Sequence, residues 1–153
     1  MQLRPLKLQD QGALVDLWYA SWCSIGLHEP VVTRADLVKR LPGDLATRWT
    51  VTVAEADERL LGFLALCVEE QRLDQLFVSP AAQGRGVGSA LFEVAVREMP
   101  NGFWLSTQPG NHRARAFYER RGMSVDHTDR GLGGDRVFYR LSGGACLADI
   151  AST

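Results

Sequence analysis

The sequence lacks a large excess of charge of either sign. Its 17 basic and 18 acidic side chains leave a formal net charge of −1. Such a chain has no broad positive field that would attract nucleic acid or an anionic membrane, so we expect neither as a partner. It also lacks an apolar run of the ~20 residues that span a bilayer, and its first residues lack the apolar core of a signal peptide. We therefore expect a cytoplasmic protein.

Cysteine is also scarce. The sequence contains only Cys23, Cys67 and Cys146. Their wide separation excludes a disulfide framework, and a reducing cytoplasm fits this usage. No group of His, Cys, Asp or Glu side chains has the spacing of metal ligands, so we expect no metal site.

The length and composition fit one domain. A chain of 153 residues, 46% of them hydrophobic, can bury one sizeable core but not two ordinary ones. We expect this domain to cover residues 1–141. The small residues of the segment 142–153 predict a tail that frays.

The apolar pattern alternates between strand and helix periods, which predicts an α/β (α+β) fold. The early strands should be antiparallel, whereas a helical crossover between two strands implies a parallel pair. Strands are expected at 2–8, 49–53, 60–68, 73–78, 103–107, 125–127 and 136–141, and helices at 11–25, 33–43, 87–99 and 111–121.

Capping residues predict where the helices begin and end. Asp10 should cap the first helix, and Thr33 with Asp36 resembles a capping box for the second. The second helix should be short, because Pro42 and Gly43 both disfavour its continuation.

Three glycines separate a predicted strand from the helix that follows. Gly84, Gly86 and Gly88 allow a tight turn whose backbone N–H groups and helix N-terminus can meet an anion. No Gly-Lys-Ser/Thr follows, as a mononucleotide P-loop requires, and Ser89 stands where the dinucleotide fingerprint needs its third glycine. The loop alone predicts an anion site at the start of a helix.

Two segments in the right order resemble the GNAT acetyltransferase superfamily. The first is Gln83-x-x-Gly86-x-Gly88, which follows the strand ending in Leu-Phe-Val-Ser-Pro. The second resembles the pattern N-x-x-A-x-x-F-Y-x-x-x-G-F, and it contains Asn111, Ala114, Phe117, Tyr118 and Gly122, with Met123 in place of the last Phe. The resemblance covers roughly residues 48–141.

The resemblance implies a mixed central sheet of about six to seven strands with about four helices. Acetyl-CoA would lie where two parallel strands, 73–78 and 103–107, splay apart. Its pantetheine arm would pair with the backbone of Leu76 and Val78, and its pyrophosphate would meet amides of the segment 84–89. The implied cofactor-binding residues are Leu76, Phe77, Val78, Gln83, Gly84, Arg85, Gly86, Val87, Gly88, Ser89, Asn111, Ala114, Phe117 and Tyr118.

The resemblance also implies catalytic groups. Tyr118 matches the general acid that protonates the departing CoA thiolate. The attacking amine needs a proton acceptor, for which the candidates are Asp74, Glu70 and Glu69. Asp74 is the first choice, because alternation along the strand would place it on the face of Leu76 and Val78. These three carboxylates could also form an acidic patch that recruits a cationic amine.

The resemblance implies transfer of an acetyl group from acetyl-CoA to a primary amine by direct attack. The alternative is a non-catalytic acyl-CoA sensor or interaction module of the same fold. The acceptor side should be the segment 11–48, with Trp22, His28 and Asp74 as candidate acceptor-binding residues. No motif identifies the amine, and exposed strand edges are compatible with a homodimer.

Overall fold

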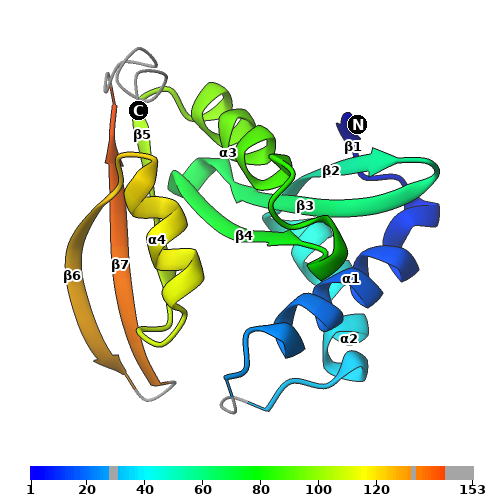
Figure 1. Ribbon diagram of the computed structural model, residues 1–153, viewed down its shortest axis with the longest axis horizontal. Helices are drawn as coiled ribbons and strands as arrows, with labels where there is room; N and C mark the ends of the chain where they lie inside the picture. The colour runs from blue at the N-terminus through cyan, green and yellow to red at the C-terminus, as the bar shows by residue number, and fades with distance from the viewer. Residues whose placement is uncertain (28–30, 132–133, 144–153) are drawn as a thin grey trace. The chain divides into compact units, whose positions relative to one another are not determined.

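The computed structural model describes residues 1–27, 31–131 and 134–143. Within them the chain forms seven strands and four α-helices (Figure 1), which confirms the predicted α/β fold class. The strands are β1 (Gln2–Pro5), β2 (Thr50–Ala56), β3 (Arg59–Cys67), β4 (Arg72–Val78), β5 (Gly102–Thr107), β6 (Ser124–Gly131) and β7 (Gly134–Ser142). The helices are α1 (Gln11–Ser24), α2 (Arg34–Thr47), α3 (Val87–Glu98) and α4 (His112–Arg120). None of these helices is long and apolar enough to cross a membrane.

Backbone contacts group the chain into two compact units, Met1–Glu98 and Met99–Thr153. The first contains β1 to β4 with α1, α2 and α3, and the second contains β5 to β7 with α4. The expectation of one domain over residues 1–141 stays a prediction.

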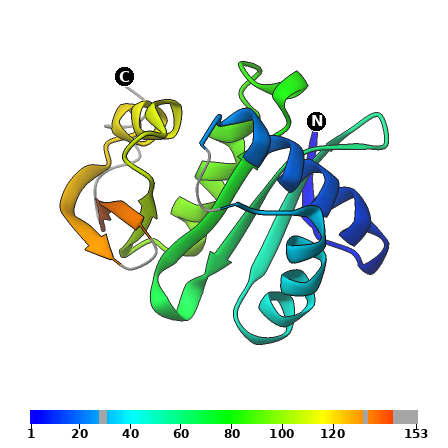
Figure 2. The same ribbon diagram turned by 90° about the horizontal axis from the view of Figure 1, so that it is seen from below.

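The first unit is built on four antiparallel strands in the order β1, β2, β3, β4. This confirms the expectation that the early strands are antiparallel. Phe63 of β3 lies in a buried cluster with the apolar side chains of α1 and α2. Its neighbour Gly62 faces Val87 and Leu91 of α3 instead. Since successive strand residues point to opposite faces, α1 and α2 cover one face of the sheet and α3 the other (Figure 2).

Close packing fixes α3 against the sheet. A Cβ atom at Gly62 would lie 2.7 Å from the carbonyl oxygen of Phe77 and 3.2 Å from Cδ1 of Leu91. Only glycine allows this approach. The start of α3 is thereby held close to the strands that precede it.

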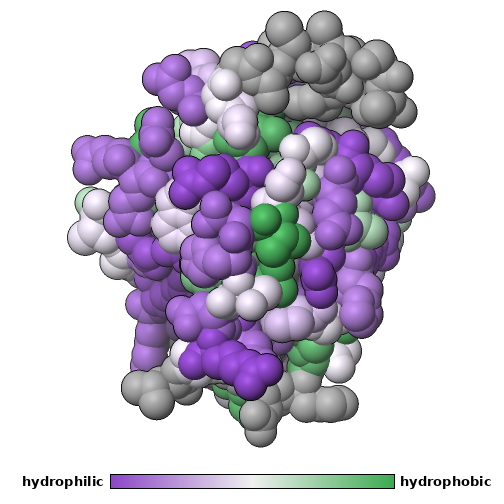
Figure 3. All heavy atoms as spheres, turned by 90° about the vertical axis from the view of Figure 1, so that its left-hand side faces the viewer, coloured by the Kyte–Doolittle hydropathy of each residue, from purple (hydrophilic) through white to green (hydrophobic). Residues whose placement is uncertain are grey.

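The second unit contains an antiparallel sheet in which β7 lies between β5 and β6. Tyr139 of β7 pairs with Leu105 of β5 on one side and with Val125 of β6 on the other, and its side chain is fully buried. All residues of β6 are exposed, and a register shift occurs between Val125 and His127. Figure 3 views the molecule from the side on which Figure 1 draws β6, and shows a mostly hydrophilic surface.

One predicted capping hydrogen bond and one predicted helix end are wrong. Asp10 precedes α1 but makes no capping hydrogen bond to it, because its carboxylate accepts from the backbone amide of Lys7 at 2.8 Å and from Arg4. The second helix runs through Pro42 to Thr47 rather than ending at Pro42. The capping box at its start is confirmed, since Thr33 and Asp36 exchange hydrogen bonds of 2.9 and 3.1 Å.

Candidate functional site

The glycine-rich loop lies between β4 and α3. A short 3-10 turn, Pro80–Ala82, follows the strand, and α3 starts at Val87. Gly84 and Gly86 have φ angles of 80° and 81°, a left-handed conformation that costs an L-residue about 1–2 kcal/mol. The glycines are therefore required by the backbone of the loop.

The loop is tied to the end of β4 and remains open to solvent. Gln83 donates a 3.1 Å hydrogen bond from Nε2 to the carbonyl oxygen of Val78. The residues from Gly84 to Gly86 are exposed, and the first intrahelical bond runs from the amide of Ala90 to the carbonyl of Gly86 at 3.1 Å. Amides in this first turn have no acceptor inside the helix, so they can bind an anion.

Asp74 lies at a β-bulge, which overturns its predicted orientation. In the pairing of β3 with β4, Ala65 is opposite Gln75 while Leu66 is opposite Leu73. Asp74 is thus the extra residue, and alternation of side chains breaks there. Its carboxylate contacts Trp49 on the face of α1 and α2. The expectation that it shares a face with Leu76 and Val78 is wrong.

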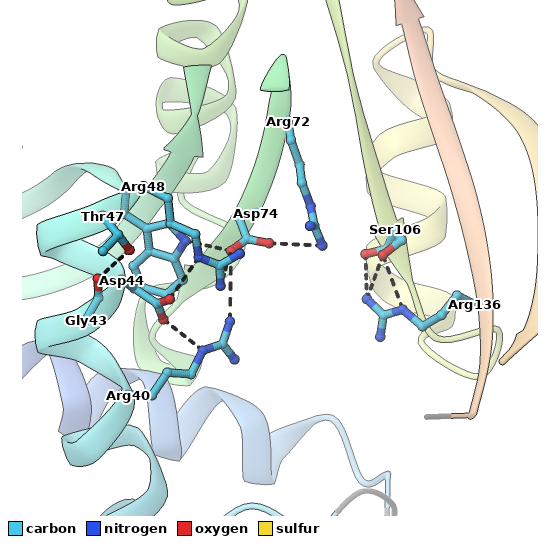
Figure 4. A network of polar contacts seen from close by, with 10 residues as sticks. Arg40, Gly43, Asp44, Thr47, Arg48, Arg72, Asp74, Ser106 and Arg136 are labelled. Atoms are coloured by element: carbon cyan, nitrogen blue, oxygen red, sulfur yellow. Dashed lines mark hydrogen bonds and ion pairs between the residues drawn. The ribbon is translucent and has the colours of Figure 1, made fainter. Parts of the chain in front are cut away.

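The carboxylate of Asp74 is buried among cations (Figure 4). Its side chain is 3% exposed, and Oδ1 lies 3.1 Å from NH2 of Arg72. Its Oδ2 accepts a 2.6 Å hydrogen bond from Trp49 and lies 3.5 Å from Arg48 and 3.9 Å from Arg40. The predicted acidic patch is therefore wrong for Asp74, because arginines surround it.

The other predicted carboxylates lie at the surface. Glu69 and Glu70 belong to a 3-10 turn, Val68–Glu70, between β3 and β4, and both are exposed. Gln71 follows with a φ of 53°, which reverses the chain into β4. Glu70 is therefore accessible to a solvated amine, whereas Asp74 is not.

The second unit holds the residues of the downstream motif. Asn111 caps α4, since its Oδ1 accepts a 3.2 Å hydrogen bond from the amide of Ala114. Tyr118 is 7% exposed, and its ring lies 5.4 Å from that of Phe117 and 6.2 Å from that of Tyr139. The predicted capping role of Asn111 is confirmed, and Tyr118 is held between aromatic rings.

The environment of Tyr118 controls its proton. Burial raises the pKa of Tyr118 above its ordinary value, and the nearby charge of Arg121 offsets only part of this rise. The phenol consequently stays protonated at neutral pH and can donate to an anion. A chain of hydrogen bonds fixes its helix, because Arg115 donates to the Tyr139 hydroxyl at 3.0 Å and that hydroxyl donates to Glu119 at 3.1 Å.

The structure describes two of the three candidate acceptor-binding residues, Trp22 and Asp74. Trp22 lies near the end of α1 and is half-buried, while Trp18 is buried in the core. His28 lies outside the described residues. Across the described ranges, no group of three or more His, Cys, Asp or Glu side chains could hold a metal ion.

Sequence reasoning missed the arginines around Asp74. Arg40, Asp44 and Arg48 are spaced four residues apart, a spacing at which opposite charges meet on a helix. That signal was hidden because Pro42 was expected to end the helix between them. The remaining partner, Arg72, comes from the start of β4.

Comparisons with known proteins agree with this architecture. Residues 13–123 match the model of the acetyltransferase (GNAT) family. Peptidyl-lysine N-acetyltransferase YiaC of Escherichia coli (strain K12) is 34% identical over 73 residues, which are 48% of this chain and 49% of that protein. The chain therefore aligns with about half the length of that relative.

Solved structures share the fold. The paia N-acetyltransferase of Thermoplasma acidophilum, solved in complex with coenzyme A, superposes with a TM-score of 0.71 at 19% identity, over 90% of this chain and 96% of that chain. The ribosomal-protein-S18-alanine N-acetyltransferase of Escherichia coli gives a TM-score of 0.75 at 18% identity, over 95% and 96%. With the family match over most of its length, the chain belongs to the acetyltransferase (GNAT) family.

Proposed function

We propose that this chain is an acetyl-CoA-dependent N-acetyltransferase that moves the acetyl group to a primary amine by direct attack. The family match supports acetyl transfer. The observation that carries the assignment is the loop at the start of α3, in which Gly84 and Gly86 adopt left-handed angles next to the first turn of the helix. This arrangement suits a pyrophosphate.

The proposed cofactor contacts are the residues of the two motif segments. The loop and Arg85 would bind the pyrophosphate, and the backbone of Leu76 and Val78 would pair with the pantetheine arm. Asn111 would add a hydrogen bond to this arm, although its Oδ1 already caps α4. The bound cofactor supplies an acetyl thioester that an amine can attack.

The proposed reaction forms a bond between the amine nitrogen and the acetyl carbon and breaks the bond from that carbon to sulfur. The amine must lose a proton, and the leaving thiolate must gain one. Tyr118 is the proposed donor to the thiolate, because its phenol stays protonated. The proposed acceptors of the amine proton are the predicted carboxylates Asp74, Glu70 and Glu69.

The surroundings of these carboxylates favour Glu70 as the base. Glu70 is exposed, whereas the oxygens of Asp74 already accept from Trp49 and pair with arginines. A carboxylate that gave up these partners to take a proton would leave the buried indole N–H of Trp49 without its acceptor. We assign Asp74 a positioning role.

A peptide lysine is one acceptor to test first, since the curated relative is named as a peptidyl-lysine N-acetyltransferase. The purified chain is incubated with acetyl-CoA and a panel of lysine peptides, peptide N-termini, amino acids and small amines, and the released thiol is measured. We expect thiol release with at least one amine, with acetylated product in equal amount. Tight acetyl-CoA binding without release from any amine would identify a non-catalytic sensor instead.

A further inference from the structure

Two arginines of the first unit are displayed on one side of α2 and its C-terminal end. Arg40 and Arg48 flank Asp44, which accepts from Nε of Arg40 at 2.8 Å and from Nε of Arg48 at 2.9 Å. The two arginine side chains are 43% and 36% exposed. The buried carboxylate of Asp44 thus holds the Nε atoms of two guanidinium groups that are themselves accessible (Figure 4).

Aromatic rings pack against these guanidinium groups. The guanidinium carbon of Arg40 lies 5.4 Å from the ring centroid of Trp18 and 5.5 Å from that of Trp49. Arg48 lies 5.9 Å from the Trp49 ring. Both indoles are buried. A guanidinium held over a ring and bonded at Nε has little freedom left, so less entropy is lost when it binds a ligand.

The terminal nitrogens of both guanidinium groups can still donate hydrogen bonds to a ligand. The NH2 atoms of Arg40 and Arg48 lie 3.9 and 3.5 Å from Oδ2 of Asp74, which is longer than an ordinary N–H···O hydrogen bond. Arginine matches planar oxyanions through parallel N–H donors. The two arginines therefore present a prepared surface for an oxyanion.

The local charge indicates which oxyanion fits. Asp74 lies beside both guanidinium groups, with its Oδ2 3.9 Å from Arg40 and 3.5 Å from Arg48. A carboxylate bound there would add one negative charge next to Asp74. A phosphate dianion would add two negative charges and would be repelled more strongly by Asp74.

We propose that Arg40 and Arg48 bind a carboxylate of the amine acceptor, so that the acceptor is an amine that also carries a carboxylate. The carboxylate can belong to an amino acid or to an acidic residue near the amine of a peptide. The carboxylate site is inferred from the geometry of α2 alone. Its assignment to the amine acceptor rests on the proposed acetyl transfer.

The first experiment measures binding without activity. The ¹H–¹⁵N resonances of the arginine side chains are followed in the full chain during titration with propionate, with sodium chloride at equal ionic strength, and with inorganic phosphate. We expect propionate to shift Arg40 and Arg48, and Arg40→Gln and Arg48→Gln each to weaken its binding about tenfold. Arg34→Gln is the control, since Arg34 is 51% exposed on the same helix and pairs with Asp16.

Three results would overturn the carboxylate site. These are no shift with propionate, equal shifts with chloride, or binding of phosphate in preference to propionate. Folding of each variant is checked by its near-UV circular dichroism. If Arg40→Gln does not fold, the same titration of Arg48→Gln and of Arg40→Lys decides, because lysine keeps the charge but lacks the planar edge.

The second experiment assigns the carboxylate to the acceptor. Each amine found active is compared with its analogue that lacks the carboxylate, such as lysine with 1,5-diaminopentane. We expect Arg40→Gln to raise KM about tenfold for the carboxylate-bearing amine, with kcat little changed, and to leave KM for its analogue unchanged. Equal effects on both amines would overturn the assignment to the acceptor. Propionate binding without acetylation of any amine would refute the proposed function and leave the carboxylate site standing.

Discussion

The indole Nε1 of Trp49 donates a 2.6 Å hydrogen bond to Oδ2 of Asp74. This contact joins the residue that precedes β2 to the bulge of β4. The side chains of Arg40, Arg48 and Arg72 surround it. Trp49 in turn packs against Trp18 with 5.4 Å between ring centroids. The polar group around Asp74 is therefore continuous with the hydrophobic core of the first unit.

Replacement of Asp74 by Asn should destabilise the fold. The change removes the negative charge that three arginines surround, and loss of one partner from a buried ion pair costs about 3 kcal/mol. Urea denaturation at neutral pH measures the change. Asp16→Asn is the control, because the Asp16 side chain is 65% exposed and its pair with Arg34 should contribute less than about 1 kcal/mol. A fully stable Asp74→Asn protein that loses turnover would identify Asp74 as the base instead.

Replacement of Tyr118 by Phe should slow turnover and spare cofactor binding. The variant keeps the ring that packs between Phe117 and Tyr139 but loses the phenolic proton. We expect kcat to fall about a hundredfold, the usual contribution of a general acid. Acetyl-CoA affinity, measured by calorimetry, should change by less than about twofold. Unchanged kcat would exclude Tyr118 as the proton donor.

Replacement of Glu70 by Gln should lower kcat by about a hundredfold if Glu70 accepts the proton of the amine. The residue is exposed, so thermal stability should stay close to that of the parent chain. Glu69→Gln is a matched control from the same 3-10 turn. Equal losses in both variants would indicate a general charge effect.

Two glycine replacements should act in opposite directions. Gly86 has a φ of 81°, so Gly86→Ala strains the loop by about 1–2 kcal/mol and should weaken acetyl-CoA binding. Gly43 lies within α2 with no atom near its missing Cβ, so Gly43→Ala should stabilise the chain by about 0.5–1 kcal/mol. Calorimetry with acetyl-CoA and thermal unfolding measure the two effects. Equal acetyl-CoA affinity of Gly86→Ala and the parent would contradict a role of the loop in binding.

The pair of Arg4 and Asp10 should make stability depend on acid pH. The hydrogen bond from Arg4 lowers the pKa of Asp10, burial works in the opposite direction, and the amide of Lys7 lowers it further. A lowered folded-state pKa gives stability that is complete above the unfolded value of about 3.9 and is lost as pH falls through the folded-state value. Asp10→Asn should cost about 1–3 kcal/mol at neutral pH.

Urea denaturation of Asp10→Asn and of the parent chain over a range of pH checks the direction of this pH dependence. The difference between them should shrink as pH falls below about 4, because the Asp10 carboxyl of the unfolded parent then takes up a proton while the folded parent keeps its carboxylate ionised to lower pH. A difference that stays constant down to about pH 2 would contradict the lowered pKa.

The order and type of the elements could be predicted because their signals are local. Apolar spacing predicts α1 and α3, and the residues Thr33 and Asn111 are recognised as caps from their own neighbours. The need for glycine at positions 84 and 86 follows from the turn between a strand and a helix. Such features depend on a few consecutive residues.

The surroundings of Asp74 could not be predicted, because two tertiary effects determine them. Helix α2 continues through Pro42, since Leu41 and Asp44 on either side are buried against the unit. A bulge then turns Asp74 toward that helix. Strand alternation and the usual effect of proline each predict the opposite. Both predictions failed where packing of distant segments outweighed the local preference.

The exposed strand β6 has a consequence for the behaviour of the protein at high concentration. It is the last strand of the antiparallel sheet of the second unit, and a fully exposed edge of this kind can template aggregation. Its bulge near His127 interrupts the row of backbone groups, and Asp126, Asp129 and Arg130 place charges along it. A second chain that added a strand here would have to desolvate these charges, so the edge resists the growth of intermolecular sheets.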